Sequence, residues 1–173
     1  MNGMPEGEQR PGRLRVEISD ERGHPLRAPG LGAWLSRVAP AAARGVVSVG
    51  LVSDQRVRVL NRSYRRKDYA TDVLSFPGAP RTRSSARRSS NQHAATSNFL
   101  GDIVIARGVA RRQAREARHS YQTELKILAL HGLLHRLGFD HERDNGRMLR
   151  VERRLRRKGG LREGLIERAR APR

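Results

Sequence analysis

The sequence lacks cysteine altogether, and this absence excludes several kinds of chemistry. Without thiols the chain forms no disulfide, offers no thiolate nucleophile and builds no cysteine-ligated zinc site. A transition metal bound by this protein must therefore take its ligands from histidine and carboxylate side chains.

Long apolar runs are also missing. No stretch approaches the roughly twenty apolar residues that a helix needs to span a bilayer. The first residues, MNGMPEGEQRPGR, contain acids and lack the apolar centre of a secretory signal. The sequence thus predicts no membrane segment, and by default a cytoplasmic protein.

Acidic residues are scarce beside basic ones: 17 Asp and Glu against 36 Lys and Arg give a formal net charge of +19. This excess goes beyond what solubility needs and attracts polyanions. No basic stretch carries the Trp/Phe/Leu face of a membrane-surface helix, so nucleic acid is favoured over a membrane as partner. A merely solvated, arginine-rich surface is the alternative interpretation.

The length of 173 residues is typical of one domain. We expect a disordered tail over 1–12, a single domain over 13–158 and a basic C-terminal tail over 159–173. Within the domain, the Ser/Arg-rich segment 79–97 has no apolar periodicity, and we expect it to be a mobile basic loop.

Apolar periodicity predicts the elements of this domain. Alternating or short β-branched runs predict strands at 13–19, 45–53, 73–76 and 99–106. Apolar residues at helical spacing predict helices at 31–38, 55–64, 107–118, 120–137 and about 143–158. Asp54 is expected to be the N-cap of the second helix. Because helices and strands follow one another without regular β-α-β alternation, the sequence predicts an α+β fold, a small mixed β-sheet with packed helices.

Three of the six histidines fall within eleven residues, in the segment HGLLHRLGFDH. His131 and His135 are four residues apart on a predicted helix, so they can present their imidazoles to one ion. Gly138 can adopt a positive φ, end the helix and return His141 towards the same point. We therefore predict one Zn²⁺ per chain on these three ligands, with the fourth tetrahedral position open, as in catalytic sites.

Two alternatives stand beside this zinc prediction. In the first, the histidines are unrelated residues on a helix and its following loop. In the second, nickel, cobalt or copper competes with zinc for the site. Asp140, next to His141, is either an acceptor that orients a ligand imidazole or an ordinary loop aspartate.

The same HxxxHxxGxxH spacing occurs in metzincin proteases, whose helix carries Glu directly after the first histidine. Here that position is Gly132, so the histidine helix is metzincin-like in spacing but lacks the usual general base of zinc proteolysis. This argues against peptide hydrolysis.

Three blocks of the sequence resemble the YbeY family of bacterial rRNA maturation factors, which are single-strand-specific, metal-dependent endoribonucleases. Residues 60–77, LNRSYRRKDYATDVLSFP, are similar to the family pattern LNxxYRxKDxPTDVLSFP. Residues 100–105, LGDIVI, match LGDIxI, and the histidine segment matches HGxLHLxGYDH. The blocks occur in the family's order over roughly residues 55–145, and a triple match of this length is highly specific.

The resemblance implies a function and a site. His131, His135 and His141 take the family's zinc-ligand positions, and Arg65 takes the place of an arginine that the family needs for activity. The implied role is maturation of ribosomal RNA, particularly the 3′ end of the small-subunit RNA, and ribosome quality control. Three departures, Arg136, Phe139 and Ala70 for Leu, Tyr and Pro, remove no ligand.

Phosphodiester cleavage needs a Lewis acid and a fixed cation to stabilise negative charge in the transition state. Zinc would supply the first, and the guanidinium of Arg65 can supply the second. Lys67 and Asp68 are supporting candidates from the same block. Asp72 is expected to hold backbone amides, and Asp102 to orient the neighbouring strand or an imidazole.

The leading hypothesis is thus a zinc-dependent endoribonuclease whose catalytic domain spans 13–158. Its expected partners are single-stranded RNA and the small ribosomal subunit, without a small-molecule cofactor. Basic residues of the loop 79–97 and of the segments 107–118 and 150–158 are expected to follow the RNA backbone, whereas few aromatic residues are available to stack on bases. The alternatives are a non-catalytic ribosome-assembly factor whose metal only stabilises the fold, and a metalloprotease.

Overall fold

The computed structural model describes residues 13–78, 98–141 and 143–161. The predictions for the tail 1–12 and the loop 79–97 lie outside the described residues, and the C-terminal tail 159–173 is described only to residue 161.

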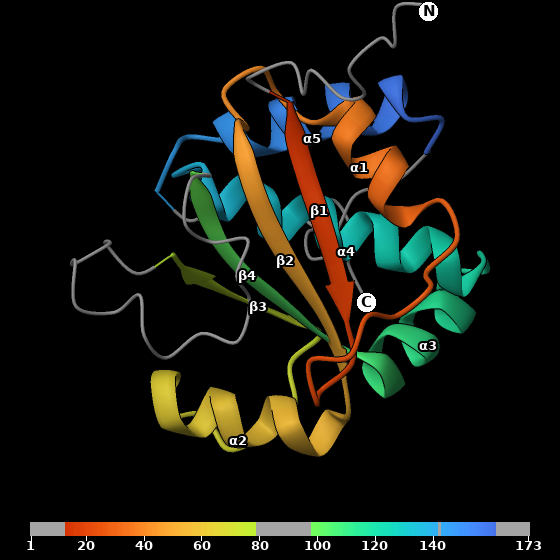
Figure 1. Cartoon of the computed structure of the whole chain (residues 1–173), viewed down its shortest axis with the longest axis vertical. Helices are drawn as coiled ribbons and strands as arrows, with labels where there is room; N and C mark the ends of the chain where they lie inside the picture. The colour runs from red at the N-terminus through yellow and green to blue at the C-terminus, as the bar shows by residue number, and fades with distance from the viewer. Residues whose placement is uncertain (1–12, 79–97, 142, 162–173) are drawn as a thin grey trace, which may run out of the picture.

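Four strands form one mixed sheet: β1 (Leu14–Ser19), β2 (Gly45–Val52), β3 (Val73–Pro77) and β4 (Phe99–Ala106). Their order is β1-β2-β4-β3 (Figure 1). β1, β2 and β4 run parallel, and β3 pairs antiparallel with β4 at one edge. The predicted α+β fold with a small mixed sheet is confirmed.

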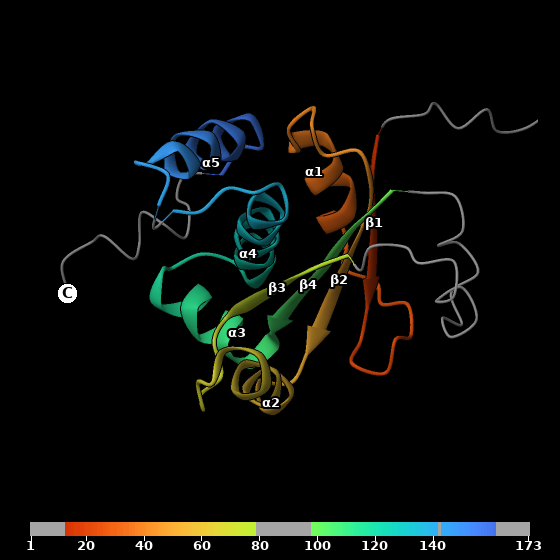
Figure 2. The same ribbon diagram turned by 90° about the vertical axis from the view of Figure 1, so that its left-hand side faces the viewer.

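Five helices complete the described fold: α1 (Leu31–Val38), α2 (Asp54–Arg65), α3 (Arg107–Glu116), α4 (Tyr121–Arg136) and α5 (Arg147–Lys158). α1 and α4 cover one face of the sheet, and α5 packs on the far side of α4 (Figure 2). α2 contributes Val57 to a smaller apolar cluster with Leu74 of β3, on the opposite face. None of these helices has the length and apolar content needed to cross a bilayer.

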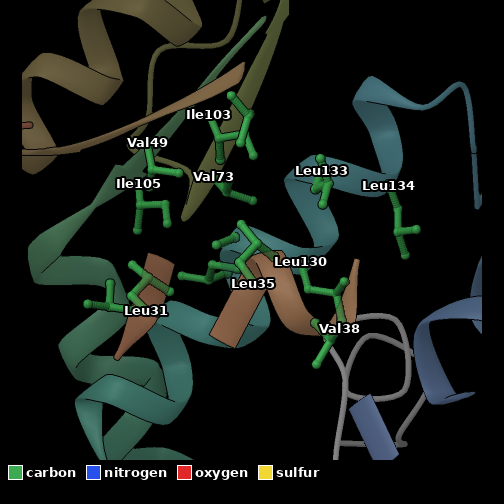
Figure 3. Close-up of a cluster of buried hydrophobic side chains, with 14 of the residues drawn as sticks. Leu31, Leu35, Val38, Val49, Val73, Ile103, Ile105, Leu130, Leu133 and Leu134 are labelled. Carbon is green, nitrogen blue, oxygen red and sulfur yellow. The ribbon is translucent and has the colours of Figure 1, made fainter. Parts of the chain in front are cut away.

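The helix α4 is the centre of the molecule. It is buried along most of its length, because leucines and isoleucine occur on all its sides rather than in one stripe. Figure 3 shows Leu130 and Leu134 of α4 in one cluster with Leu35 of α1 and Ile103 of β4. Contacts on several sides fix the rotation of α4 about its axis, and therefore the direction of every side chain that it carries.

Two predicted helix starts are wrong. Ser53, not Asp54, is the N-cap of α2, since its hydroxyl accepts a hydrogen bond from the amide of Arg56 at 3.2 Å. Asp54 instead accepts from the amide of Gly108 at 2.8 Å, at the start of α3. The last helix begins at residue 147 rather than about 143, because the chain before it turns through Gly146 at φ 77°.

Candidate metal centre

The three histidines come from the second half of α4 and from the turn behind it. α4 ends at Arg136, and Gly138 follows at φ 84°. Its amide donates to the carbonyl of His135 at 3.1 Å, and the amide of Phe139 donates to the carbonyl of Leu134 at 3.1 Å. This pair of hydrogen bonds is the Schellman motif, which satisfies the last carbonyls of a helix and reverses the chain. The predicted helix stop at Gly138 is confirmed, and it returns His141 to α4.

The imidazoles of His131, His135 and His141 converge. The Nε2 atoms of His131 and His135 lie 3.1 Å apart. Two nitrogens at imidazole distances from one tetrahedral ion stand about 3.3 Å apart, which is close to this spacing. With His141, the three ligand atoms lie within 4.8 Å of one another, and the described part of the chain contains no other such group of His, Cys, Asp or Glu.

The environment keeps His135 in the form that binds metal. Burial, and after it the charge of the neighbouring His131 and His141, lower the pKa of His135 to about 4. A hydrogen bond with the backbone of Phe139 and the carboxylate of Asp140 act in the opposite direction. At neutral pH the His135 ring is therefore neutral and its lone pair is free for a cation. The chemistry of this donor set fits a bound metal ion.

Glu152 is a member of the site that the sequence-based prediction missed. Its side chain comes from α5, and Oε2 lies 3.3 Å from Nδ1 of His131. Both residues are buried, with 1% of Glu152 and 6% of His131 exposed. A carboxylate at Nδ1 holds the proton there, orients the ring and leaves Nε2 as the ligand atom. The carboxylate thus sets which nitrogen of His131 faces His135.

A signal for Glu152 existed in the sequence. On α5 the buried positions are Met148, Leu149, Leu155 and Arg156 together with Glu152 itself. A carboxylate in the apolar stripe of a basic amphipathic helix is rare unless it has a partner, so this position indicates a polar contact. The identity of the partner depends on how α5 lies across α4.

Gly132 marks the closest approach of α4 to the sheet. A Cβ atom added to Gly132 would stand 2.7 Å from Cγ2 of Ile103 and 3.1 Å from Oγ of Ser75. The hydroxyl of Ser75 donates to the carbonyl of Gly132 at 3.3 Å. Position 132 thus has no room for a side chain, and the glutamate that metzincins carry there would be forced into the sheet.

Replacing Gly132 with alanine is expected to destabilise the protein by about 1–3 kcal/mol, because Ile103 is branched at Cβ and cannot turn away cheaply. Urea unfolding of the metal-free protein measures the change. Gly32→Ala in α1 is the matched control, since its added Cβ meets Val16 only at 3.7 Å. Equal or greater stability of Gly132→Ala would contradict this account of the close approach.

Arg65 lies across the edge strand from the histidines. It is the last residue of α2 and is exposed. The preceding residue, Tyr64, places its ring edge-on against Phe76 of β3, with centroids 5.0 Å apart. Ser75, the residue before Phe76 in β3, points to the other face and contacts α4. α2 and α4 run towards the same side of the molecule, so their C-terminal ends lie on either side of β3 (Figure 1).

Comparison with known proteins gives the family. Residues 33–158 match the model of the family described as Endoribonuclease YbeY. The chain belongs to the YbeY endoribonuclease family. The Endoribonuclease YbeY of Solibacter usitatus is 46% identical over 145 residues, which cover 83% of this chain and 86% of that protein. The relative of the same name from Koribacter versatilis is 44% identical over 143 residues, covering 82% and 84%.

A solved structure is similar in fold. The solution structure of TM1509 from Thermotoga maritima matches with a TM-score of 0.54 and covers 84% of this chain and 88% of its own. At 23% identity this likeness concerns the fold alone. The YbeY resemblance inferred from the three sequence blocks is thus confirmed.

The remaining candidates from the YbeY-like blocks do not join the histidine cluster. Lys67 is exposed, and Asp68 forms a two-pronged ion pair with Arg58, with both distances 2.9 Å. Asp72 accepts a hydrogen bond from its neighbouring amide, that of Val73, at 2.8 Å. Its other carboxylate oxygen accepts from the side chain of Gln113 at 2.9 Å. These contacts tie the start of β3 to α3 and hold the loop behind α2 in shape.

Asp102 and Asp140 lie on different sides of the sheet. Asp102 alternates with the buried Ile103, which faces α4, so its side chain points to the opposite face. There burial raises its pKa, against a hydrogen bond with Ser48 of the neighbouring β2. This placement fits a role between strands and not the orientation of an imidazole. Asp140 lies in the histidine turn, close enough to influence His135 electrostatically.

Proposed function

We propose that this chain is a zinc-dependent endoribonuclease that cleaves single-stranded RNA in the maturation of ribosomal RNA, at the 3′ end of the small-subunit RNA, and in ribosome quality control. The domain 13–158 would carry the activity, with the small ribosomal subunit as partner and the cytoplasm as location. The observation that carries the proposal is a cluster of three converging histidines in a member of the YbeY endoribonuclease family.

His131, His135 and His141 would hold the zinc ion, and Glu152 would keep the proton of His131 on Nδ1 so that Nε2 stays a ligand. When bound there, zinc supplies a Lewis acid that stabilises negative charge on the reacting phosphate. Arg65 would bind two oxygen atoms of a phosphate through its planar guanidinium. Arg65 lies beyond the edge strand β3, and this position suits a phosphate of an RNA strand that runs along β3.

The protease alternative has little support from the packing around Gly132. The general base of that chemistry would need a side chain at a position where an added Cβ already meets Ile103 at 2.7 Å. The assembly-factor alternative shares the same histidine cluster, since a metal that joins α4 to the following turn also stabilises a fold. Variants that remove one ligand histidine distinguish the assembly-factor alternative from the endoribonuclease.

The first test is the substitution Arg65→Ala. We expect it to lower kcat on an unstructured RNA by about 100-fold or more, because it removes a fixed cation from the developing charge. Arg65→Lys is expected to recover only part of the loss, since an ammonium does not bind phosphate at two points. Rates under single-turnover conditions measure the effect.

Arg56→Ala is the matched control, an exposed arginine near the other end of the same helix. Zinc content should stay unchanged in all three variants. Wild-type rates for Arg65→Ala would remove Arg65 from the proposed site.

A further inference from the structure

Two aromatic side chains are exposed in the segment 62–69, which contains Arg65. The whole chain has only three Tyr, three Phe and one Trp. Tyr64 is 69% exposed and Tyr69 is 54% exposed, the highest values among the exposed large hydrophobic side chains of the described residues. Two of the few aromatic residues of this chain are therefore exposed to solvent, and they lie within six residues of each other in the sequence. Burying either ring would have stabilised the fold, so their exposure indicates a contact surface.

The ring of Tyr64 and the backbone of Tyr69 are each held by a contact within the fold. The ring of Tyr64 rests edge-on against Phe76 at 65° between the ring planes. The carbonyl of Tyr69 accepts a hydrogen bond from the side chain of Asn61 at 2.9 Å, and Asn61 itself is buried in α2. The ion pair of Asp68 with Arg58 further holds the loop against the helix. Because the ring of Tyr64 and the backbone of Tyr69 are already held, both residues lose less conformational entropy when a ligand stacks on them.

The surroundings of the two rings are strongly positive. Four exposed cationic side chains lie in the same segment: Arg62, Arg65, Arg66 and Lys67. Within the described ranges none of these four side chains forms a hydrogen bond or an ion pair, whereas the acid of the segment, Asp68, is paired with Arg58. The four charges are therefore available to phosphates, and they attract a polyanion from a distance.

We propose that Tyr64 and Tyr69 stack on unpaired bases of an RNA strand while the four cations bind its phosphates, so that this segment selects single strands for the site. The inference rests on the proposed function, and it names unpaired bases as the part of the RNA that the segment recognises. Stacking needs a base whose face is free, which a duplex does not offer, and it tolerates any base. The scarcity of aromatic residues predicts little such stacking, but the structure exposes two of them in the segment 62–69, which contains Arg65.

The test is binding of a single-stranded 2′-O-methyl oligonucleotide of about twelve nucleotides, a length within known site sizes, carrying 2-aminopurine at its centre. Tyr64→Ala and Tyr69→Ala are each expected to bind about tenfold more weakly and to lose quenching of the 2-aminopurine fluorescence. Tyr64→Phe and Tyr69→Phe should bind as the wild type does, because they keep the ring. Binding of the corresponding duplex should be the same in all variants.

Val59→Ala is the matched control, an exposed apolar residue on the same helix, and it should change nothing. Tyr69→Ala matters most, because no ring contact supports Tyr69 in the described structure and its loss should not disturb folding. Unchanged binding and quenching in both alanine variants would overturn the inference. So would an equal loss of duplex binding, or an equal loss of binding to polyglutamate, which would indicate an acidic protein as partner.

The two proposals fail separately. Cleavage of the unmodified strand is measured with the same wild-type preparation. If the wild type cleaves but the tyrosine variants bind normally, only the stacking inference fails. If the tyrosine effect holds but the zinc-loaded wild type leaves RNA intact, the proposed function fails and single-strand binding stands.

Discussion

Replacing His135 with alanine is expected to lower the rate of RNA cleavage by about 1,000-fold or more while the protein stays folded. The substitution removes an imidazole whose Nε2 lies 3.1 Å from that of His131, and it leaves two of three ligands. A Lewis acid contributes several kcal/mol to the stabilisation of a phosphoryl transition state, and about 4 kcal/mol corresponds to that factor. The fold should survive, because alanine favours helices and the leucines of α4 carry the packing.

Circular dichroism and single-turnover cleavage of the same His135→Ala sample are the measurements. His24→Ala is the matched control, since His24 has a largely exposed side chain outside the cluster and should leave activity and metal content unchanged. If His135→Ala instead unfolds when its metal is lost, the ion is a structural staple, and the assembly-factor alternative gains the support that the enzyme loses.

The second large effect is expected from Glu152→Gln. This substitution keeps the shape of the side chain but removes the charge that accepts the Nδ1 proton of His131. Loss of such a carboxylate behind a ligand histidine typically costs 10- to 100-fold in metal affinity, so we expect the Kd for zinc to rise by about that factor. Competition with a chromophoric chelator measures Kd without reference to activity.

Glu124→Gln is the matched control for this variant. Glu124 is also fully buried, and its Oε2 lies 3.0 Å from Nε2 of His119, which is outside the cluster. Zinc affinity should be unchanged in Glu124→Gln even if its stability falls. Equal losses of zinc affinity in the two variants would show that a buried carboxylate affects zinc binding only through the stability of the fold. Glu152 would then have no specific role in orienting His131.

The ligand cluster could be predicted from the sequence because its geometry is local. His131 and His135 are one helical turn apart, and Gly138 is the residue that reverses the chain towards His141. The sequence shows that position 132 lacks a general base. It does not predict the contact of Gly132 with Ile103, because the packing of a helix on a sheet joins residues far apart in sequence. The position of β3 at the sheet edge beside β4 likewise depends on contacts between residues far apart in sequence, so the sequence pattern does not predict it.

Other features could not be predicted, for physical reasons that differ. Glu152 reaches His131 only because α5 crosses α4, an arrangement that no local pattern specifies. The side of the sheet on which Asp102 lies follows from strand register, where a shift by one residue reverses every side chain. Asp54 carries a signal for helix capping, but Ser53 caps α2 and Asp54 binds the amides at the start of α3. Two neighbouring capping residues are indistinguishable until the helix that the second one serves is placed.

The central claim is that the three histidines hold a metal ion that the protein uses to cleave RNA. Its most direct test is a zinc titration of the metal-stripped protein, with cleavage of an unstructured RNA and of its duplex followed at each addition. We expect no cleavage without zinc, a rise in single-strand cleavage that ends at one zinc per chain, and an intact duplex throughout. Full cleavage by the stripped protein, or intact single strands at one bound zinc per chain, would contradict the account.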